Sequence, residues 1–229
     1  MTLAAISESC WPACVEVGMG AKLVVGRLDD SQTALLPDEA HLAEGVTQAR
    51  LRELRAGRTI ARYAITALGG ISESIQMAAS GAPIWPDKYC GSLTHTNRYV
   101  AALIALSNEF SAVGVDIDDG RPLGGSVNGV AHADELELVC NLGNRGNSSP
   151  ECLVFSIKEA LFKCQCPLTD DALLEFLHVR LVPGKESGSI GIEVMDPNRR
   201  KLTQLARHLR VHVQVINGIT AACVVSPRK

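Results

Sequence analysis

The sequence predicts an α+β protein made of two halves that meet near residue 110. A long helical pattern occupies the first half, short strand-like runs fill the middle, and a second helix with further strand-like runs occupies the rest. The chain has 229 residues, of which 46% are hydrophobic, so it can bury a core as one large domain or two small ones.

Charge and cysteine content narrow the classes of function. The net charge of -3 comes from 22 basic and 25 acidic side chains, so no overall positive field favours a nucleic acid or an anionic membrane as partner. The eight cysteines show no CxxC pair, which favours reduced cytosolic thiols over a zinc site. Neither the first 15 residues nor the apolar run at 99–106 fits a signal or membrane segment, so we expect a soluble cytoplasmic protein.

Residues 37–70 predict a helix that ends at Gly69-Gly70. Its apolar positions recur at helical spacing, and its other face is unusually basic, with Arg50, Arg52, Arg55, Arg58 and Arg62. The face is either a solvated helix surface or part of a phosphate-binding site.

Breakers at 81–86 precede predicted strands at 91–94, 99–106 and 111–118. Two predicted loops, 119–130 and 143–149, flank a helical segment at 134–142. Ser148 and Glu151, with Pro150 between them, predict a capping box for a helix that ends near Cys164. The remaining chain predicts a short helix at 199–208 and strands at 174–182, 190–195 and 209–225.

Two carboxylates end the predicted strand at 111–118. Because strand side chains alternate, Asp116 and Asp118 share one face while Val115 and Ile117 occupy the other. Two hard oxygen ligands on one face suit Mg²⁺, which takes one or two protein carboxylates. A polar strand exit is the alternative.

The capped helix separates an apolar arc from a face that carries Lys158, Glu159 and Lys163. Phe155 and Phe162 share this charged face. Because a solvated face would be expected to avoid two phenylalanines, we expect it to meet another element. The alternative is a surface ion pair between Glu159 and Lys163.

Small hydroxyl residues and a histidine occur in the segment Gly91-Ser-Leu-Thr94-His95, which covers the predicted strand at 91–94 and the residue after it. Such groups can donate hydrogen bonds to phosphate oxygens, especially beside arginines. A histidine in the core or on the surface without such a role is the alternative.

Taken together, these motifs resemble the surfactin/enterobactin-type 4'-phosphopantetheinyl transferases. The resemblance covers about residues 50–165 and is carried by Gly57-Arg58, Pro83-Ile-Trp-Pro86, Gly91-Ser-Leu-Thr-His95, Gly114-Val-Asp-Ile-Asp118 and Phe155-Ser-Ile-Lys-Glu-Ala-Leu-Phe-Lys163. The Trp-Pro and Gly-Ser-x-Thr-His segments look most like the enterobactin synthetase component D-like branch. The last 60 residues carry no such motif.

The resemblance implies a monomeric pseudo-dimer of two similar α/β subdomains, 1–110 and 111–229, with coenzyme A and Mg²⁺ in the cleft between them. By position, Asp116, Asp118 and Glu159 match the metal-binding acids, and Glu159 and Lys163 match the catalytic residues. The residues that match coenzyme A contacts are Arg50, Arg58, Arg62, Pro83, Thr94, His95, Lys158 and Lys163.

The chain departs from the family's pattern at three positions. Asp118 stands where Glu is common and is one methylene shorter, so it reaches the metal either directly or through water. Thr94 replaces a serine and keeps its hydroxyl, whereas Ala82 replaces a lysine and removes one phosphate contact.

The reaction implied is transfer of phosphopantetheine from coenzyme A to a serine of an apo acyl or peptidyl carrier protein, with release of 3',5'-ADP. The carrier could serve fatty acid, polyketide or nonribosomal peptide synthesis, and the branch resemblance favours siderophore or related secondary metabolism. Two alternatives remain: a coenzyme A or nucleotide-phosphate binding module without transferase activity, and a Mg²⁺ phosphohydrolase.

Overall fold

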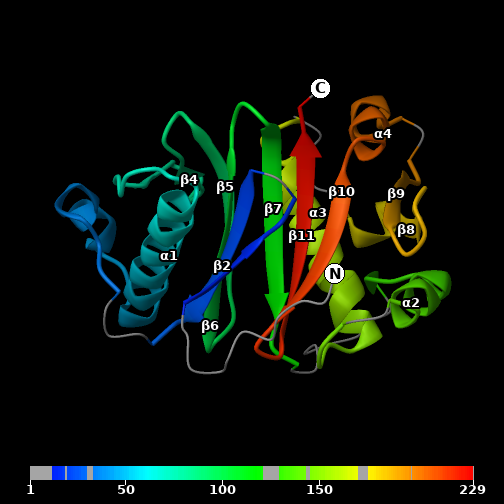
Figure 1. The fold of residues 1–229 in the computed structure, drawn as a ribbon, viewed down its shortest axis with the longest axis horizontal. Coiled ribbons are helices and arrows are strands. Elements are labelled where there is room, and N and C mark those ends of the chain that lie inside the picture. The colour runs from blue at the N-terminus through cyan, green and yellow to red at the C-terminus, as the bar shows by residue number, and fades with distance from the viewer. Residues whose placement is uncertain are drawn as a thin grey trace. The chain divides into compact units, whose positions relative to one another are not determined.

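A computed structural model describes residues 12–18, 20–29, 33–120, 129–142, 145–169, 175–196 and 198–228. The chain divides into two compact units, Met1–Leu106 and Ser107–Lys229. Both units combine antiparallel sheets with helices, which confirms the predicted mixed class (Figure 1). Within the described ranges, every helix is too short or too polar to cross a bilayer.

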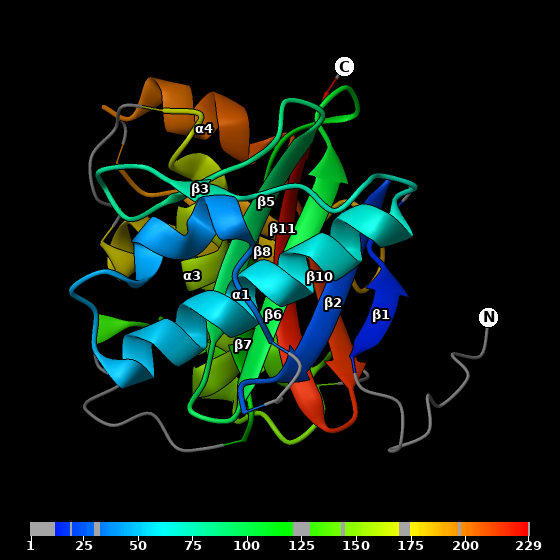
Figure 2. The same cartoon turned by 90° about the vertical axis from the view of Figure 1, so that its left-hand side faces the viewer.

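The first unit is built on a four-stranded antiparallel sheet in the order β1-β2-β6-β5. Its helix α1 lies over the sheet, as Figure 2 shows. A 3-10 helix, η1, and a small β3-β4 hairpin complete the unit. The bounds are β1 Ala13–Glu16, β2 Ala21–Arg27, η1 Pro37–Ala43, α1 Gln48–Ala67, β3 Gln76–Met77, β4 Pro83–Ile84, β5 Tyr89–His95 and β6 Tyr99–Leu106.

The predicted single helix over 37–70 is wrong between η1 and α1. Gly45 adopts a φ of 69°, which a continuing helix excludes. Thr47 then starts α1, because its side-chain oxygen accepts a hydrogen bond from the Arg50 N–H at 3.2 Å. The predicted strands at 91–94 and 99–106 are confirmed as β5 and β6, whereas β1 and β2 were not predicted.

The second unit is built on a three-stranded antiparallel sheet in the order β10-β11-β7. Helix α3 packs against β7 and β11, and α2 packs against α3 (Figure 1). A separate β8-β9 hairpin contacts α2 and α4. The bounds are β7 Phe110–Asp118, α2 Ala133–Cys140, α3 Pro150–Gln165, η3 Phe176–His178, β8 Val179–Pro183, β9 Ile190–Val194, α4 Arg200–Ala206, β10 Arg210–Ile216 and β11 Ile219–Pro227.

Three predictions in this unit need correction. The predicted strand at 174–182 begins only at Val179, because residues 176–178 form the 3-10 helix η3. Ser149, not Ser148, caps α3: its side chain accepts from the Cys152 N–H at 3.2 Å, and Pro150 takes the first helical position. The predicted strand at 209–225 is a hairpin, since Asn217 and Gly218 both adopt positive φ in a two-residue turn. The segments 121–128, 143–144 and 170–174, parts of two predicted loops and one predicted strand, lie outside the described residues.

The approach of α3 to β7 depends on Gly114. A Cβ at this position would lie 2.7 Å from the Cys164 amide nitrogen and 3.0 Å from the Ala160 carbonyl carbon. These are backbone atoms, so no side-chain rotation could relieve the clash. The absence of a side chain therefore allows α3 to lie directly on the strand that carries Asp116 and Asp118.

We expect Gly114→Ala to lower the free energy of unfolding by about 1–3 kcal/mol, because the added methyl group forces α3 away from β7. Gly57→Ala in α1 is the matched control, since its Cβ would first meet a Leu93 methyl group at 3.5 Å. That substitution should be neutral or stabilise the protein by up to about 1 kcal/mol through helix propensity. Urea unfolding measures both, and equal effects would contradict the close packing at Gly114.

Candidate active site

Asp116 and Asp118 lie on one side of β7, as predicted from strand alternation. Val115, before the pair, and Ile117, between them, are buried at 0% and 5% exposure. The pairing of Asp116 with Ala222 and of Asp118 with Thr220 on β11 holds both acids in the sheet. Asp116 itself is 9% exposed, so it is a nearly buried carboxylate.

The last turn of α3 brings Lys163 to Asp116. The Lys163 Nζ donates to Asp116 Oδ1 at 2.8 Å and to the Val115 carbonyl oxygen at 3.1 Å. These bonds fix an ammonium group beside the carboxylate at the point where helix and strand meet. Two residues that the sequence assigned to one site are therefore in direct contact.

Glu159 lies one helical turn before Lys163 and faces the same two charges. Burial raises the pKa of the Glu159 carboxyl above its usual value. Lys163 opposes this increase in pKa, and the charge of Asp116 adds to it. Glu159 is thus a carboxylate with increased proton affinity that feels both the positive charge of Lys163 and the negative charge of Asp116.

Asp118 is held differently from Asp116. Its Oδ1 accepts the Gly120 N–H at 2.9 Å, and its Oδ2 accepts the Ser148 hydroxyl. Ser148 is a site neighbour that the sequence reasoning missed, because it was interpreted as the cap of α3. Both oxygens of Asp118 therefore already accept hydrogen bonds within the unit.

The arrangement fits a divalent cation at Asp116 and Glu159. The negative charge of Asp116 contributes to the raised pKa of Glu159, and a hard cation between the two carboxylates would offset that repulsion. Asp118 is less suited to direct coordination because both its oxygens have partners. Across the described residues, no three His, Cys, Asp or Glu side chains gather as a ready metal cluster.

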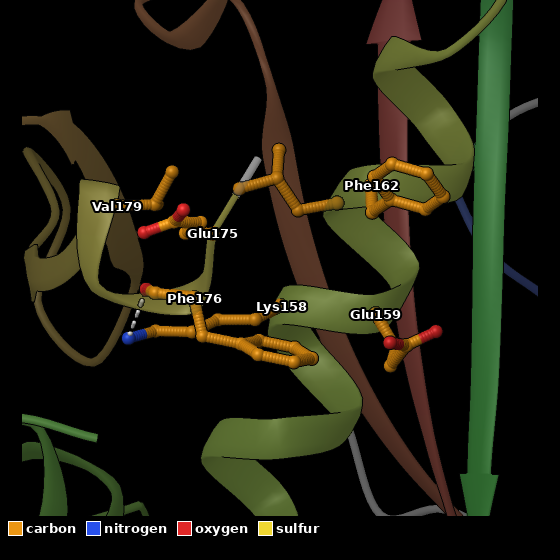
Figure 3. Close-up of a pocket in the computed structure, with 7 residues that line it drawn as sticks. Lys158, Glu159, Phe162, Glu175, Phe176 and Val179 are labelled. Atoms are coloured by element: carbon orange, nitrogen blue, oxygen red, sulfur yellow. Dashed lines mark hydrogen bonds between the residues drawn. The ribbon is translucent and has the colours of Figure 1, made fainter. Parts of the chain in front are cut away.

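A pocket of about 240 Å³ borders Glu159 on α3. Figure 3 shows Lys158 and Glu159 leaving the helix in different directions, with the Phe176 ring beside Lys158. The prediction that the phenylalanine face of α3 meets another element is confirmed, because the Phe155 and Phe176 ring centroids lie 5.3 Å apart. The pocket is lined by Lys158, Glu159, Leu161, Phe162, Glu175, Phe176 and Val179.

Lys158 is buried at 3% exposure and holds several segments together. Its Nζ donates to Glu135 Oε2 at 2.8 Å, to the Val130 carbonyl at 2.8 Å and to the Phe176 carbonyl at 3.0 Å. An ammonium group has three N–H donors, so all are used. Burial lowers the pKa of Lys158, and Glu135 opposes that decrease. The coenzyme role of Lys158 stays a prediction that would require one of these bonds to break.

In the first unit, Arg50 and His95 are brought together by a residue the sequence reasoning missed. Arg50 Nη1 lies 3.1 Å from Glu53 Oε2, and His95 Nε2 lies 3.5 Å from the same oxygen. These side chains come from the start of α1 and the end of β5. Thr94, the residue before His95, is buried. Pro83 is the first residue of β4.

Arg58 and Arg62 are buried, although the sequence placed them on a basic helix face. Arg58 donates to the carbonyls of Ile75 and Gln76 at 2.7 and 3.1 Å, and burial lowers its pKa. Arg62 donates to both carboxylate oxygens of Glu39 at 2.9 and 2.8 Å. Their assignment to coenzyme A stays a prediction, and each would have to exchange or share these partners.

Glu39 and Glu135 occupy equivalent places in the two units. Each is the third residue of a short helix and accepts the backbone N–H of that helix's cap residue. Each also accepts a backbone N–H from a later segment, Ile75 or Leu181, and pairs with a buried cation of the unit's main helix. The shared pattern has a local sequence signal, an acid at the third helical position.

The comparisons with known proteins agree with the motif resemblance. A family described as the 4'-phosphopantetheinyl transferase N-terminal domain matches residues 38–105. The chain is 32% identical over 172 residues to the 4'-phosphopantetheinyl transferase Svp of Streptomyces mobaraensis, covering 74% of this chain and 69% of the relative.

Two further relatives match shorter stretches. The 4'-phosphopantetheinyl transferase Npt of Nocardia iowensis is 34% identical over 134 residues, covering 58% of this chain and 60% of its own length. The 4'-phosphopantetheinyl transferase PptT of Mycobacterium tuberculosis (strain ATCC 25618 / H37Rv) is 32% identical over 139 residues, covering 58% of this chain and 59% of its own length. This chain belongs to the 4'-phosphopantetheinyl transferase family.

We expect Lys158→Met to lower the free energy of unfolding by about 3–5 kcal/mol, because it leaves Glu135 charged, buried and without its cation. Lys163→Met on the same helix is the comparison and should cost less, about 1–2 kcal/mol, since its ion pair with Asp116 is only partly buried, with side-chain exposures of 26% and 12%. Urea unfolding and coenzyme A titration are measured together. A Lys158→Met protein of unchanged stability with weakened coenzyme A binding would contradict the structural role.

Proposed function

We propose that this protein transfers the 4'-phosphopantetheine group of coenzyme A to a serine of an apo acyl or peptidyl carrier protein. The observation that carries the proposal is the meeting of Asp116, Glu159 and Lys163 where α3 lies on β7, in a member of this family. The new bond joins the serine oxygen to the β-phosphate of coenzyme A. The bond to 3',5'-ADP breaks, and the serine proton leaves with a base.

Glu159 is the proposed base. Burial raises the pKa of its carboxyl, which increases its affinity for the serine proton. The serine hydroxyl could transfer its proton to Glu159 directly or through one water molecule. Glu159 borders the described pocket, so an incoming hydroxyl has access to it.

Lys163 is the proposed electrostatic partner of the pyrophosphate. Charge on the phosphate oxygens rises as 3',5'-ADP departs, and a positioned ammonium group stabilises it. The bonds of Lys163 to Asp116 and Val115 hold the group in place before the substrate binds. Such preorganisation avoids reorientation during the reaction.

Asp116 and Glu159 would hold Mg²⁺, with Asp118 acting through a water or through Ser148. The bound ion would polarise the phosphate oxygens and neutralise part of their charge. Asp118 keeps a positioning role in this proposal because its two hydrogen bonds tie the end of β7 to Gly120 and Ser148.

The basic residues of the first unit are the proposed contacts for the adenosine and phosphate end of coenzyme A. Arg50 and His95 already share Glu53, so phosphate oxygens could replace that carboxylate as their partner. Arg58 is proposed to hold the 3'-phosphate end together with His95, and the further proposed contacts are Arg62, Thr94 and Lys158. Pro83 and its neighbours would line the adenine pocket with backbone atoms.

The pocket beside Glu159 suits the pantetheine arm. Its walls include Leu161, Phe162, Phe176 and Val179, which match the methylene groups of the arm, and Lys158 and Glu175 add polar atoms. Pockets of this kind bind ligands by apolar contact and use few polar groups for orientation. An arm held there would end next to the proposed base.

The equivalent carboxylates Glu39 and Glu135 support a pseudo-dimer of two similar subdomains, proposed as 1–110 and 111–229. A duplicated unit is expected to repeat such a feature, here a buried glutamate that binds two backbone N–H groups and a cation of the main helix. The cleft location of the active site, the monomeric state, the cytoplasmic location and a role in siderophore or related secondary metabolism stay predictions from the motif resemblance.

We expect Glu159→Gln to lower kcat for carrier modification by about 10²–10⁴-fold, because the variant cannot accept the serine proton. Mass spectrometry of an apo carrier incubated with coenzyme A and Mg²⁺ detects the added phosphopantetheine. Glu151→Gln, in the first turn of the same helix, is the matched control and should retain activity. Near-normal turnover of Glu159→Gln would contradict its role as base.

Omission of the carrier separates the competing functions. Coenzyme A should stay intact without a carrier, whereas a phosphohydrolase would cleave it. If coenzyme A binds but several apo carriers gain no mass at any divalent metal tested, the binding-module alternative replaces the transferase.

A further inference from the structure

The last 33 residues, 197–229, contain none of the chain's 25 acidic side chains but seven of its 22 basic ones. A chain with a net charge of -3 therefore concentrates positive charge in one segment of its second unit. Charge asymmetry of this kind predicts an anionic partner when the cations gather on one surface. The proposed chemistry of Asp116, Glu159 and Lys163 does not use these cations.

Helix α4 displays part of this charge on one face. Leu202 and Ala206 are buried at 1% and 6% exposure and attach the helix to the unit. At 100° per residue, Arg200, Lys201 and Arg207 lie away from these two side chains, and all three are exposed. None of the described acidic side chains forms an ion pair with them. We name Arg200, Lys201 and Arg207 the basic face of α4.

Two exposed apolar side chains, Leu177 and Met195, come before α4 in the chain. Leu177 in η3 is 39% exposed, and Met195 after β9 is 45% exposed. The Met195 N–H donates to the His178 carbonyl at 2.9 Å, so the end of β9 lies against η3. Met195 precedes α4 by five residues, and α4 packs on β9 (Figure 1).

The apolar pair is also adjacent to the pocket beside Glu159. Phe176 and Val179, which line that pocket, flank Leu177 and His178 in the chain. Val179 pairs with Val194, the residue before Met195. The η3-β8-β9 segment therefore carries both the pocket wall and the apolar pair. The basic face of α4 follows directly after it in the chain.

We propose that Leu177, Met195 and the basic face of α4 form the docking surface for the carrier protein, and that its acidic face binds there. This inference rests on the proposed transferase function, which requires the carrier's serine to reach Glu159. Apolar anchors beside a charged rim are typical of protein interfaces, and the charges steer and orient an acidic helical partner. The low overall charge makes a nucleic acid or a membrane less suited than a small acidic protein.

Charge reversal tests the docking surface. The test variant is R200E/K201E/R207E, and the control is R27E/K185E/R228E, which changes the net charge equally at exposed cations elsewhere. Steady-state kinetics are measured with an apo carrier that the wild-type protein modifies, varying carrier and coenzyme A separately. Binding of the same carrier with its acceptor serine replaced by alanine is measured by titration, at low and high salt.

The test variant should raise the KM for the carrier by about tenfold or more and weaken carrier binding by a similar factor at low salt. Its KM for coenzyme A and its kcat at saturating carrier should stay within about twofold, and the control variant should resemble the wild type. Leu177→Ser/Met195→Ser should weaken carrier binding as well, with little salt dependence.

An unchanged carrier KM in the test variant, with wild-type transfer intact, would overturn the docking surface and leave the transferase function standing. Equal losses in the test and control variants would also overturn it, because they would indicate a general charge effect. Binding of anionic vesicles or duplex DNA that is lost in the test variant, while the carrier KM is kept, would assign the surface to that other partner. Absence of any transfer by the wild type would contradict the proposed function itself.

Discussion

The direct packing of α3 on β7 is the constraint on which the candidate site depends. Gly114 leaves no Cβ between the strand and the backbone at Ala160 and Cys164. The strand contributes Asp116 and Asp118, and the helix contributes Glu159 and Lys163. Because side chains at Glu159 and Lys163 are one helical turn apart, a single close helix–strand contact places an acid and a base against Asp116.

Buried ion pairs provide the second level of organisation. Glu39 and Glu135 each gather two backbone amides and a cation from the main helix, so each ties a short helix, a later segment and the main helix together. In the second unit the same Lys158 also binds the Phe176 carbonyl and thereby positions η3. The pocket beside Glu159 and the proposed docking surface both include or adjoin η3, so this anchor would connect the proposed catalytic site with the proposed docking surface.

The spacing of apolar and polar residues along the sequence predicted several helices and strands and part of the candidate site. Strand β6, most of β7 and the helix α3 follow from side-chain periodicity, and the site acids follow from alternation on β7 and spacing on α3. Which cations are buried could not be predicted, because Arg62 and Lys158 find their carboxylates 23 residues away in sequence. Ser148 was misassigned by one position because two consecutive serines can cap the same helix, and only tertiary contact with Asp118 separates them.

A double-mutant cycle on Asp116 and Glu159 tests the central claim that strand and helix form one catalytic centre. The quantity measured is kcat/KM for carrier modification by Asp116→Asn, Glu159→Gln and the double variant, with unfolding curves to confirm folded protein. If both carboxylates serve one metal and one reaction, the double variant should lose little more than the worse single variant. Losses that multiply would show that the two residues act independently and would contradict a shared centre at the contact of α3 with β7.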